Sequence, residues 1–401
     1  MTLKTSLKRL VKMTNMDEHI PVLLNEVIEG LSIKPSGIYL DLTVGRGGHS
    51  SEILARLKEG RLIAVDQDEE AIKASTERLE KISSNFQIVR SNFSALDEIL
   101  NSLGIEEVDG ILMDLGVSSP QFDKGERGFS YNSDARLDMR MDQRQTLTAY
   151  QIVNTYSLQD LNQILRDYGE EKYSFSIAKN IIKARETAPI ETTFQLVDII
   201  KKSKPMKELK KVGHPAKQVF QALRIAVNDE LNVLVKALRS ALNHLKPGGR
   251  LAVITFHSGE DRIVKNIFKE AAVEVGNRID GPMTTNGKDY ILINHKPITA
   301  SESELTRNHR SASAKLRIIA KKGKGATIMM VMKDKLVKFN HKGMYYRFRK
   351  LGIALLAVIS IGTVVAVPTY ITFREINNQA QHAEEEQPDL LEETEVDLLS
   401  Y

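Results

Sequence analysis

The sequence predicts an α/β fold in which a parallel sheet is covered by helices on both faces. Short apolar runs alternate with stretches in which apolar residues recur at helical spacing, as in strands joined by crossover helices. The runs are apolar at successive positions, which is typical of strands buried on both sides. A glycine-rich turn follows the first run and leads into a helical pattern. Such sheets bind ligands beyond the carboxyl ends of their strands.

The expected elements follow in a regular order along the chain. Apolar residues at Val22, Val27 and Leu31 predict a helix ahead of the first strand, which ends at Asp41. The further elements are strands over 62–66, 86–89, 110–114, 251–256, 290–294 and 315–320, helices over 69–81, 96–103 and 215–245, and a helical stretch over 148–204. The alternation of strands and helices stops after the fourth strand and resumes before the fifth. We therefore expect an inserted helical subdomain between them.

The turn after the first strand indicates a nucleotide-like cofactor. Glycines let the backbone approach a ligand, and the helix that follows offers free N–H groups. Gly45 and Gly47 fit the dinucleotide fingerprint, but Ser50 stands at its third glycine position. Asp41 and Asp66 each close a strand, which favours S-adenosylmethionine, because its ammonium group and ribose hydroxyls suit nearby carboxylates. The alternative is a tight turn without a ligand, since a single glycine loop is weak evidence.

A second observation strengthens the ligand site. Asp41, Asp66, Phe93 and Asp114 all fall at the carboxyl ends of expected strands. These ends lie on one edge of a parallel sheet, so the four side chains should converge there.

Composition limits the chemistry and indicates a polyanionic partner. The chain has no cysteine, which excludes disulfides, cysteine-ligated zinc and thiol catalysis and suits a reducing cytosol. The net charge is +4, but nine acidic residues and no Lys or Arg follow Arg374, so residues 1–374 carry +13. A body this basic favours a polyanionic partner or surface.

Several ordered segments together resemble one family, the bacterial small-subunit ribosomal RNA cytosine-N4 methyltransferases (RsmH, also called MraW). The resemblance extends over about residues 17–320. It rests on His19-Ile20-Pro21-Val22, Gly45-Arg46-Gly47-Gly48-His49-Ser50, Asp114-Leu115-Gly116-Val117-Ser118-Ser119, Leu137-Asp138-Met139-Arg140-Met141, Phe220-Gln221-Ala222-Leu223-Arg224-Ile225, Phe256-His257-Ser258, Asn308-His309-Arg310-Ser311 and Lys315-Leu316-Arg317. The sequence departs from the family pattern at Arg136, Gly259 and His309.

The resemblance implies a fold and a division of the chain. The fold is a class I, Rossmann-like S-adenosylmethionine-dependent methyltransferase domain with an inserted helical subdomain. We expect the methyltransferase domain at 17–122 and 213–320, the helical subdomain at 123–212, a basic linker at 321–350, a transmembrane candidate at 351–371 and an acidic, disordered tail at 372–401.

The resemblance also implies the reaction and its site. Family members transfer a methyl group from S-adenosylmethionine to a cytosine in the decoding centre of 16S ribosomal RNA, so the small ribosomal subunit is the expected partner. The implied cofactor contacts are Gly47, Gly48, His49, Asp66, Phe93, Asp114 and Gln121, and no metal is expected. Phe93 is expected to pack on the adenine, while Arg310, Lys315 and Arg317 are expected to hold RNA phosphates.

Asp114 is the candidate catalytic residue. The lone pair of cytosine N4 is delocalised into the ring, so a carboxylate that accepts an N4–H bond would increase its nucleophilicity and could take the proton after transfer. Equally, Asp114 could only bind the cofactor. His257 and Ser258 end the fifth strand and could line the target pocket, although a structural role for His257 is as well supported.

The C-terminal segment has a different composition. Residues 351–371 contain no charged side chain, and at about 1.5 Å per residue these 21 residues span about 31 Å, which matches a hydrocarbon core of ~30 Å. The basic flank before it predicts that the methyltransferase domain faces the cytoplasm, with this segment as its candidate membrane tether. The segment also resembles the start of an exported protein, as in a fusion with a neighbouring reading frame. Whether the protein forms homo-oligomers is left open.

Two other classes of function compete with methylation. NAD-dependent oxidoreduction is disfavoured by Ser50 and by the lack of a second catalytic constellation. A membrane-tethered RNA-binding or division-associated scaffold is motivated by the basic body and the apolar segment. Binding of S-adenosylmethionine separates the three.

Overall fold

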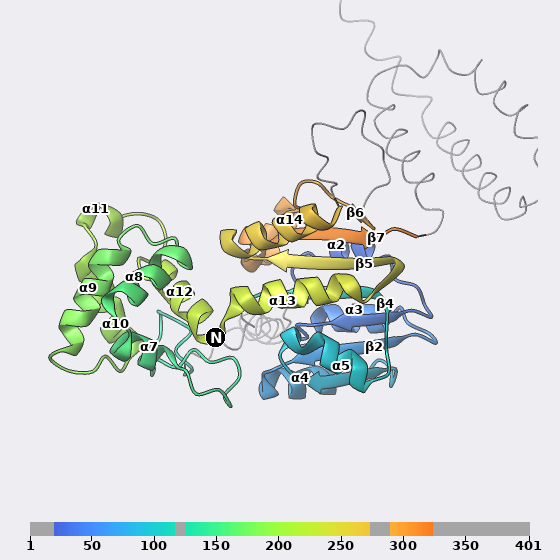
Figure 1. Ribbon diagram of the computed structural model, residues 1–401, viewed down its shortest axis with the longest axis horizontal. Coiled ribbons are helices and arrows are strands. Elements are labelled where there is room, and N and C mark those ends of the chain that lie inside the picture. Colours follow the sequence, from blue (N-terminus) through green and yellow to red (C-terminus); the bar gives the residue numbers. More distant parts are fainter. Residues whose placement is uncertain (1–19, 117–125, 273–288, 324–401) are drawn as a thin grey trace, which may run out of the picture. The chain divides into compact units, whose positions relative to one another are not determined.

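The computed structural model describes residues 20–116, 126–272 and 289–323 (Figure 1). The chain divides into two compact units, 1–327 and 328–401, and all of the described residues belong to the first. The predicted transmembrane segment at 351–371 lies outside them.

Seven strands among the described residues form one sheet in the order β3-β2-β1-β4-β5-β7-β6. The strands are β1 (Ile38–Asp41), β2 (Arg61–Asp66), β3 (Phe86–Arg90), β4 (Val108–Asp114), β5 (Leu245–Thr255), β6 (Tyr290–Leu292) and β7 (Lys315–Lys321). The first five pair in parallel, as the sequence predicts. β7 runs antiparallel to β5, and β6 runs antiparallel to β7. The sheet is therefore mixed, and the expectation of a parallel sheet is wrong for its last two strands, which need no crossover helix to pair.

Helices cover both faces of the sheet. They are α2 (Leu24–Leu31), α3 (Gly48–Leu54), α4 (Glu69–Leu79), α5 (Leu96–Ser102), α13 (Glu230–Asn243) and α14 (Ser258–Ala272), with the shorter η1 (Phe93–Ala95), α15 (Glu302–Arg307) and η2 (His309–Ser313). Successive strand residues point to opposite faces. Leu40 accordingly packs in one apolar cluster with α5, α13 and α14, while Tyr39 packs in another with α2 and α3. Both side chains are fully buried, which fixes the register of β1 and the position of the turn that follows it.

A separate group of helices lies beside the sheet (Figure 1). It comprises α7 (Ala149–Thr155), α8 (Leu158–Asp167), α9 (Ser174–Arg185), α10 (Thr193–Ser203), α11 (Met206–Leu209) and α12 (Lys217–Asn228). These helices share an apolar cluster of their own, which includes Leu161, Ile177, Leu196 and Leu223. A capping box at Thr148 starts the first of them. This independent core supports our proposal of an inserted helical subdomain. Because α12 packs in the same core, we extend the proposed subdomain from its expected end at residue 212 to Asn228.

The single helix predicted over 215–245 is wrong. The chain forms α12 and then α13, and it turns between them at Asp229, whose φ is 49°. The two helices serve different cores, because Val227 packs with the helical subdomain and Leu234 with the sheet. Helical spacing continues across the break, so periodicity alone could not reveal it.

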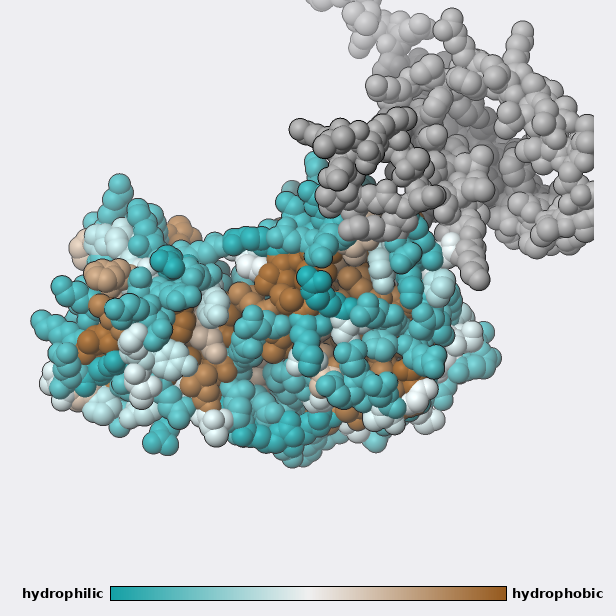
Figure 2. Space-filling model, in the orientation of Figure 1, coloured by the Kyte–Doolittle hydropathy of each residue, from teal (hydrophilic) through white to brown (hydrophobic). Residues whose placement is uncertain are grey.

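No helix within the described ranges is both long and apolar enough to cross a membrane. The face of the molecule drawn in Figure 2 is largely hydrophilic, with smaller hydrophobic areas between the charged side chains.

Candidate active site

A cavity of about 1080 Å³ lies beyond the carboxyl ends of the parallel strands and continues along the helical subdomain. The sheet and its loops contribute Val44, Gly45, Gly48, His49, Asp66, Phe93, Asp114, Phe256, His257 and Ser258 to its walls. The helical subdomain and the loops before α12 contribute Tyr131, Glu170, Lys204, His214, Gln221 and Arg224. One cavity thus joins the predicted cofactor site to the basic insertion.

The structure brings most of the predicted cofactor contacts together. Five of the seven line the cavity, namely Gly48, His49, Asp66, Phe93 and Asp114. Gly47 does not line the cavity, although its positive φ of 74° and its packing, in which a Cβ would lie 3.3 Å from Ser75, account for a glycine there. Gln121 lies outside the described residues. The individual roles of all these residues stay proposals.

Asp66 is held in place by the glycine turn. The backbone N–H of Gly45 donates to its Oδ2 at 2.9 Å, and that of Asp68 donates to its Oδ1 at 3.0 Å. Burial raises the pKa of Asp66, and these two hydrogen bonds act against that rise. Each oxygen keeps a further lone pair, so the carboxylate can accept from two hydroxyl groups of a ribose.

Asp41 does not face the cofactor cavity, although its position at the end of β1 predicted that it would. Its side chain is buried and does not line the cavity. Ser50 donates its hydroxyl to Oδ2 at 2.7 Å, and the backbone N–H of Thr43 donates to Oδ1 at 3.2 Å. Burial raises the pKa of Asp41 to about 6. The serine at the third glycine position therefore anchors the turn through Asp41, and Asp41 supports the site from behind.

Asp114 carries a strongly perturbed carboxyl group in the cavity wall. Burial, together with the charges of Asp41 and Glu260, raises its pKa to about 8. Its Oδ2 lies 3.5 Å from Nδ1 of His49, whose Nε2 donates to the Val22 carbonyl at 2.9 Å. That bond leaves Nδ1 as the acceptor of the neutral ring, which a protonated Asp114 can satisfy.

The second oxygen of Asp114 is chemically more informative. Oδ1 is buried and has no hydrogen-bond partner among the described residues. A buried carboxylate oxygen without a partner costs free energy, so its retention in a cavity wall points to a donor supplied by a ligand.

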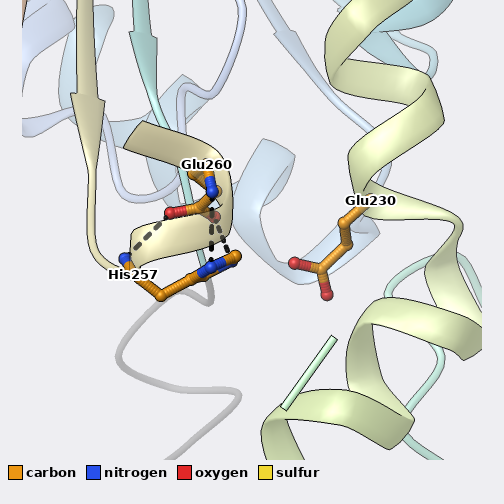
Figure 3. Close-up of side chains that lie close together, drawn as sticks. All are labelled: Glu230, His257 and Glu260. Carbon is orange, nitrogen blue, oxygen red and sulfur yellow. Dashed lines mark hydrogen bonds and ion pairs between the residues drawn. The ribbon is translucent and has the colours of Figure 1, made fainter. Parts of the chain in front are cut away.

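Three ionisable side chains, Glu230, His257 and Glu260, form a cluster that the sequence did not predict (Figure 3). His257 lines the same cavity as Asp114. One possible ligand atom each from Glu230, His257 and Glu260 lies within 4.8 Å of the others, a spacing that could hold a metal ion. Arg224, however, donates to both oxygens of Glu230 at 2.7 and 2.8 Å. Glu260 is buried, accepts from the backbone N–H of Phe256 at 2.8 Å, and lies 3.1 Å from His257 Nε2. These partners already compensate both carboxylates, and the absence of a metal stays a prediction.

Glu260 remains ionised in spite of its burial. Burial raises its pKa, but the His257 ring, whose Nε2 lies 3.1 Å from Oε1, and the charge of Arg224 outweigh that effect and hold the pKa below its usual range. His257 therefore both lines the cavity and supports a buried carboxylate, so the two roles that the sequence left open are compatible.

Two of the basic residues predicted to hold RNA phosphates already pair with an acidic side chain. Arg317 is only 8% exposed and donates to Asp261 at 2.7 and 3.2 Å, so it does not fit that role. Lys315 also lies 3.5 Å from Asp261. By contrast, Arg46 and Lys217 line the cavity, are exposed, and form no ion pair within the described ranges.

Comparison with known proteins decides the family. The model of the MraW methylase family matches residues 16–322. The chain belongs to this family. Two relatives named ribosomal RNA small subunit methyltransferase H are each 54% identical to it. The one from Mesoplasma florum aligns over 77% of the chain and 100% of its own length, and the one from Exiguobacterium sibiricum over 76% and 99%. An rRNA methylase structure from Streptococcus thermophilus covers 75% of the chain and 93% of its own, with 12% identity and a TM-score of 0.33, which supports no functional conclusion.

Membership of the MraW methylase family confirms the class I methyltransferase fold, here with a mixed sheet. The chain is a methyltransferase, and its cofactor is S-adenosylmethionine. The cavity fits this cofactor, because a glycine turn, Asp66, Phe93 and Asp114 line one space, and Oδ1 of Asp114 has no partner among the residues that the structure describes.

Asp66→Ala should weaken S-adenosylmethionine binding by ~1.5–3 kcal/mol, the range for hydrogen bonds to a charged group. The loss should appear in calorimetric titrations of the folded variant. Glu69→Ala is the matched control, because Glu69 follows on the same segment, pairs with Arg90 at the surface and does not line the cavity. An Asp66→Ala variant with wild-type affinity would exclude Asp66 as a cofactor ligand.

Proposed function

We propose that this methyltransferase modifies the exocyclic N4 atom of a cytosine in the decoding centre of 16S ribosomal RNA. Family membership makes the chain an rRNA methyltransferase of the small subunit. The observation that carries the finer proposal is the buried Oδ1 of Asp114 in the cofactor cavity, which has no hydrogen-bond partner in the part of the chain that the structure describes. An exocyclic amine can donate a hydrogen bond to such an oxygen, whereas a ring carbon of cytosine cannot.

In this proposal Asp114 acts on the amine. Methyl transfer from a sulfonium is an in-line displacement, for which the protein supplies orientation and a site without bulk water. The carboxylate accepts one N4–H bond, which returns electron density to nitrogen, and then takes the proton once the new N–CH₃ bond has formed. A pKa near 8 in the free protein is close to the working pH, as suits a general base.

The helical subdomain provides the surface for RNA. Its helices α9 and α10 end in basic residues, and the cavity continues along it. Arg46, in the turn after β1, and Lys217, at the start of α12, both line the cavity and are exposed. They are therefore our candidates for phosphate contacts. A flipped cytosine would then reach the methyl group with its backbone held at both sides.

A protein of residues 1–322 should bind S-adenosylmethionine and methylate isolated small ribosomal subunits at the single-turnover rate of the full chain. The family match ends at residue 322, and β7 ends at Lys321. Transfer of a radiolabelled methyl group to small-subunit RNA, with large subunits as the negative control, measures this. An inactive, folded 1–322 protein would show that the catalytic unit needs residues beyond it.

We also propose that residues 351–371 anchor the full chain in a membrane with the methyltransferase domain on the cytoplasmic side. The segment has no charge and follows a basic stretch. The full chain should stay with membranes during carbonate extraction, while the 1–322 protein should not. Leu356→Lys with Ile359→Lys should release the full chain, since each lysine at a helix centre opposes insertion by ~3 kcal/mol. Release of the unmodified full chain would exclude the anchor.

A further inference from the structure

Two aromatic rings stack on the helical-subdomain side of the cavity. The centroids of Tyr131 and His214 are 4.3 Å apart and their planes differ by 6°. Both residues line the cavity that also contains Asp114. Neither belongs to the predicted cofactor contacts, and they come from loops more than eighty residues apart in the sequence.

The ring pair rests on a rigid base. Phe220 meets Tyr131 edge-on at 5.7 Å and is itself part of the core of the helical subdomain. The loop that carries His214 is tied down by Lys204, which donates to the Pro215 carbonyl at 2.7 Å. Lys204 in turn pairs with the buried Glu171 at 2.6 Å, and both side chains are more than nine-tenths buried. A loop fixed in this way presents its ring at little cost in conformational entropy.

His214 offers a neutral ring in a defined tautomer. The backbone N–H of Ala216 donates to its Nδ1 at 3.2 Å, so the ring proton is on Nε2. Burial lowers the pKa of His214, with further contributions from the charges of Lys201 and Lys204. The exposed Lys217 follows three residues later, lines the same cavity, and forms no ion pair within the described part of the chain.

We propose that the Tyr131–His214 pair is a stacking site for one unpaired base of the RNA substrate next to the target cytosine, with Lys217 at that nucleotide's phosphate. The proposal rests on the function proposed above and adds a second nucleotide site to it. Aromatic side chains bind single-stranded RNA by stacking on successive bases, and a nearby cation holds the backbone. The Tyr131–His214 pair belongs to the helical subdomain, whereas the methyl donor is held at the sheet. An RNA strand that occupies both sites would therefore span the cavity.

His214→Ala should weaken binding of a fluorescein-labelled, single-stranded RNA hexanucleotide by about 5- to 100-fold, the range for losing one base–aromatic stack. The KM for small subunits should rise by a similar factor, while the single-turnover rate at saturation and the affinity for S-adenosylmethionine should not change. His214→Phe should retain most of the RNA affinity, because it keeps an aromatic ring for stacking, although it loses the hydrogen bond from the Ala216 N–H. Lys217→Ala should weaken binding and reduce its dependence on salt.

Phe194→Ala is the matched control, since Phe194 is an aromatic residue of the same subdomain that is 44% exposed and does not line the cavity. Equal affinities for wild type and His214→Ala, or an equal loss in His214→Phe and His214→Ala, would overturn the proposal. The melting temperatures of the variants exclude unfolding as the cause. A wild-type chain that binds the hexanucleotide through His214 but methylates no small subunit would contradict the proposed function and leave the stacking site standing.

Discussion

Asp114→Asn should slow methyl transfer to small ribosomal subunits by ~10²-fold or more under single-turnover conditions. Asparagine preserves the shape of the side chain and still offers an oxygen acceptor, but it cannot take the proton that N4 releases. The affinity for S-adenosylmethionine should fall by less than the rate, because only the part of the affinity that depends on ionised Asp114 is lost. A loss of affinity with an unchanged rate at saturation would make Asp114 a cofactor ligand without a catalytic role.

The same substitution should stabilise the fold at high pH. The pKa of Asp114 is about 8 in the native state against 3.8 for an ordinary aspartate, so its contribution to stability is fully present below pH 3.8 and is lost as the pH rises through 8. Removing the charge should therefore raise the free energy of unfolding at pH 9 by about 1–3 kcal/mol. The full pKa difference, at ~1.4 kcal/mol per unit, would give a larger gain. We expect less because the Asp114 side chain is 24% exposed, so solvent screens its charge.

Asp109→Asn is the matched control for both effects. Asp109 is also buried in β4, but it accepts from Lys34 at 2.9 Å and from Lys246 at 2.8 Å, does not line the cavity, and has a lowered pKa. Its substitution should destabilise the fold and leave the single-turnover rate unchanged. If both substitutions slowed methyl transfer and raised the free energy of unfolding at pH 9 to the same extent, the effects would not be specific to Asp114.

The affinity for S-adenosylmethionine should rise with pH between about 7 and 8, by up to tenfold per unit. The cofactor carries a sulfonium charge, which favours ionised Asp114, so binding below pH 8 should release close to one proton. Asp41, with a pKa of about 6, is already ionised in this window and does not obscure the effect. Above pH 8 the affinity should level off.

Calorimetric titrations at pH 7.3 in two buffers of different ionisation enthalpy measure this proton release directly. The released proton should disappear in Asp114→Asn and persist in Asp109→Asn. Wild-type binding without proton release would mean that the cofactor does not act on the ionisation of Asp114.

The sequence was most informative where the chemistry is local. A strand end places its terminal side chain on the rim of a parallel sheet, and this rule located Asp66 and Asp114 in one cavity. Phe93 lines the same cavity from η1, just beyond the end of β3 at Arg90. It failed for Asp41, because whether a strand-end side chain faces the ligand or the turn depends on its partners. Ser50 supplies a hydroxyl within 2.7 Å and turns Asp41 away.

The features that escaped prediction depend on contacts between distant segments. The turn at Asp229 arises because α12 and α13 join different cores, which no local pattern records. Glu260 looks like a surface residue of an amphipathic helix, yet it is buried against His257 and near Arg224. Tyr131 and His214 meet only because the helical subdomain closes its own core.

Mass analysis of nucleosides tests the central claim most directly. Small ribosomal subunits that lack the modification are incubated with the full chain and S-adenosylmethionine bearing a trideuterated methyl group, and the 16S RNA is then digested to nucleosides. We predict that the label appears in N4-methylcytidine and that Asp114→Asn abolishes it within the same incubation time. Label in 5-methylcytidine or on a ribose oxygen, or no label from the active wild-type chain, would contradict the account.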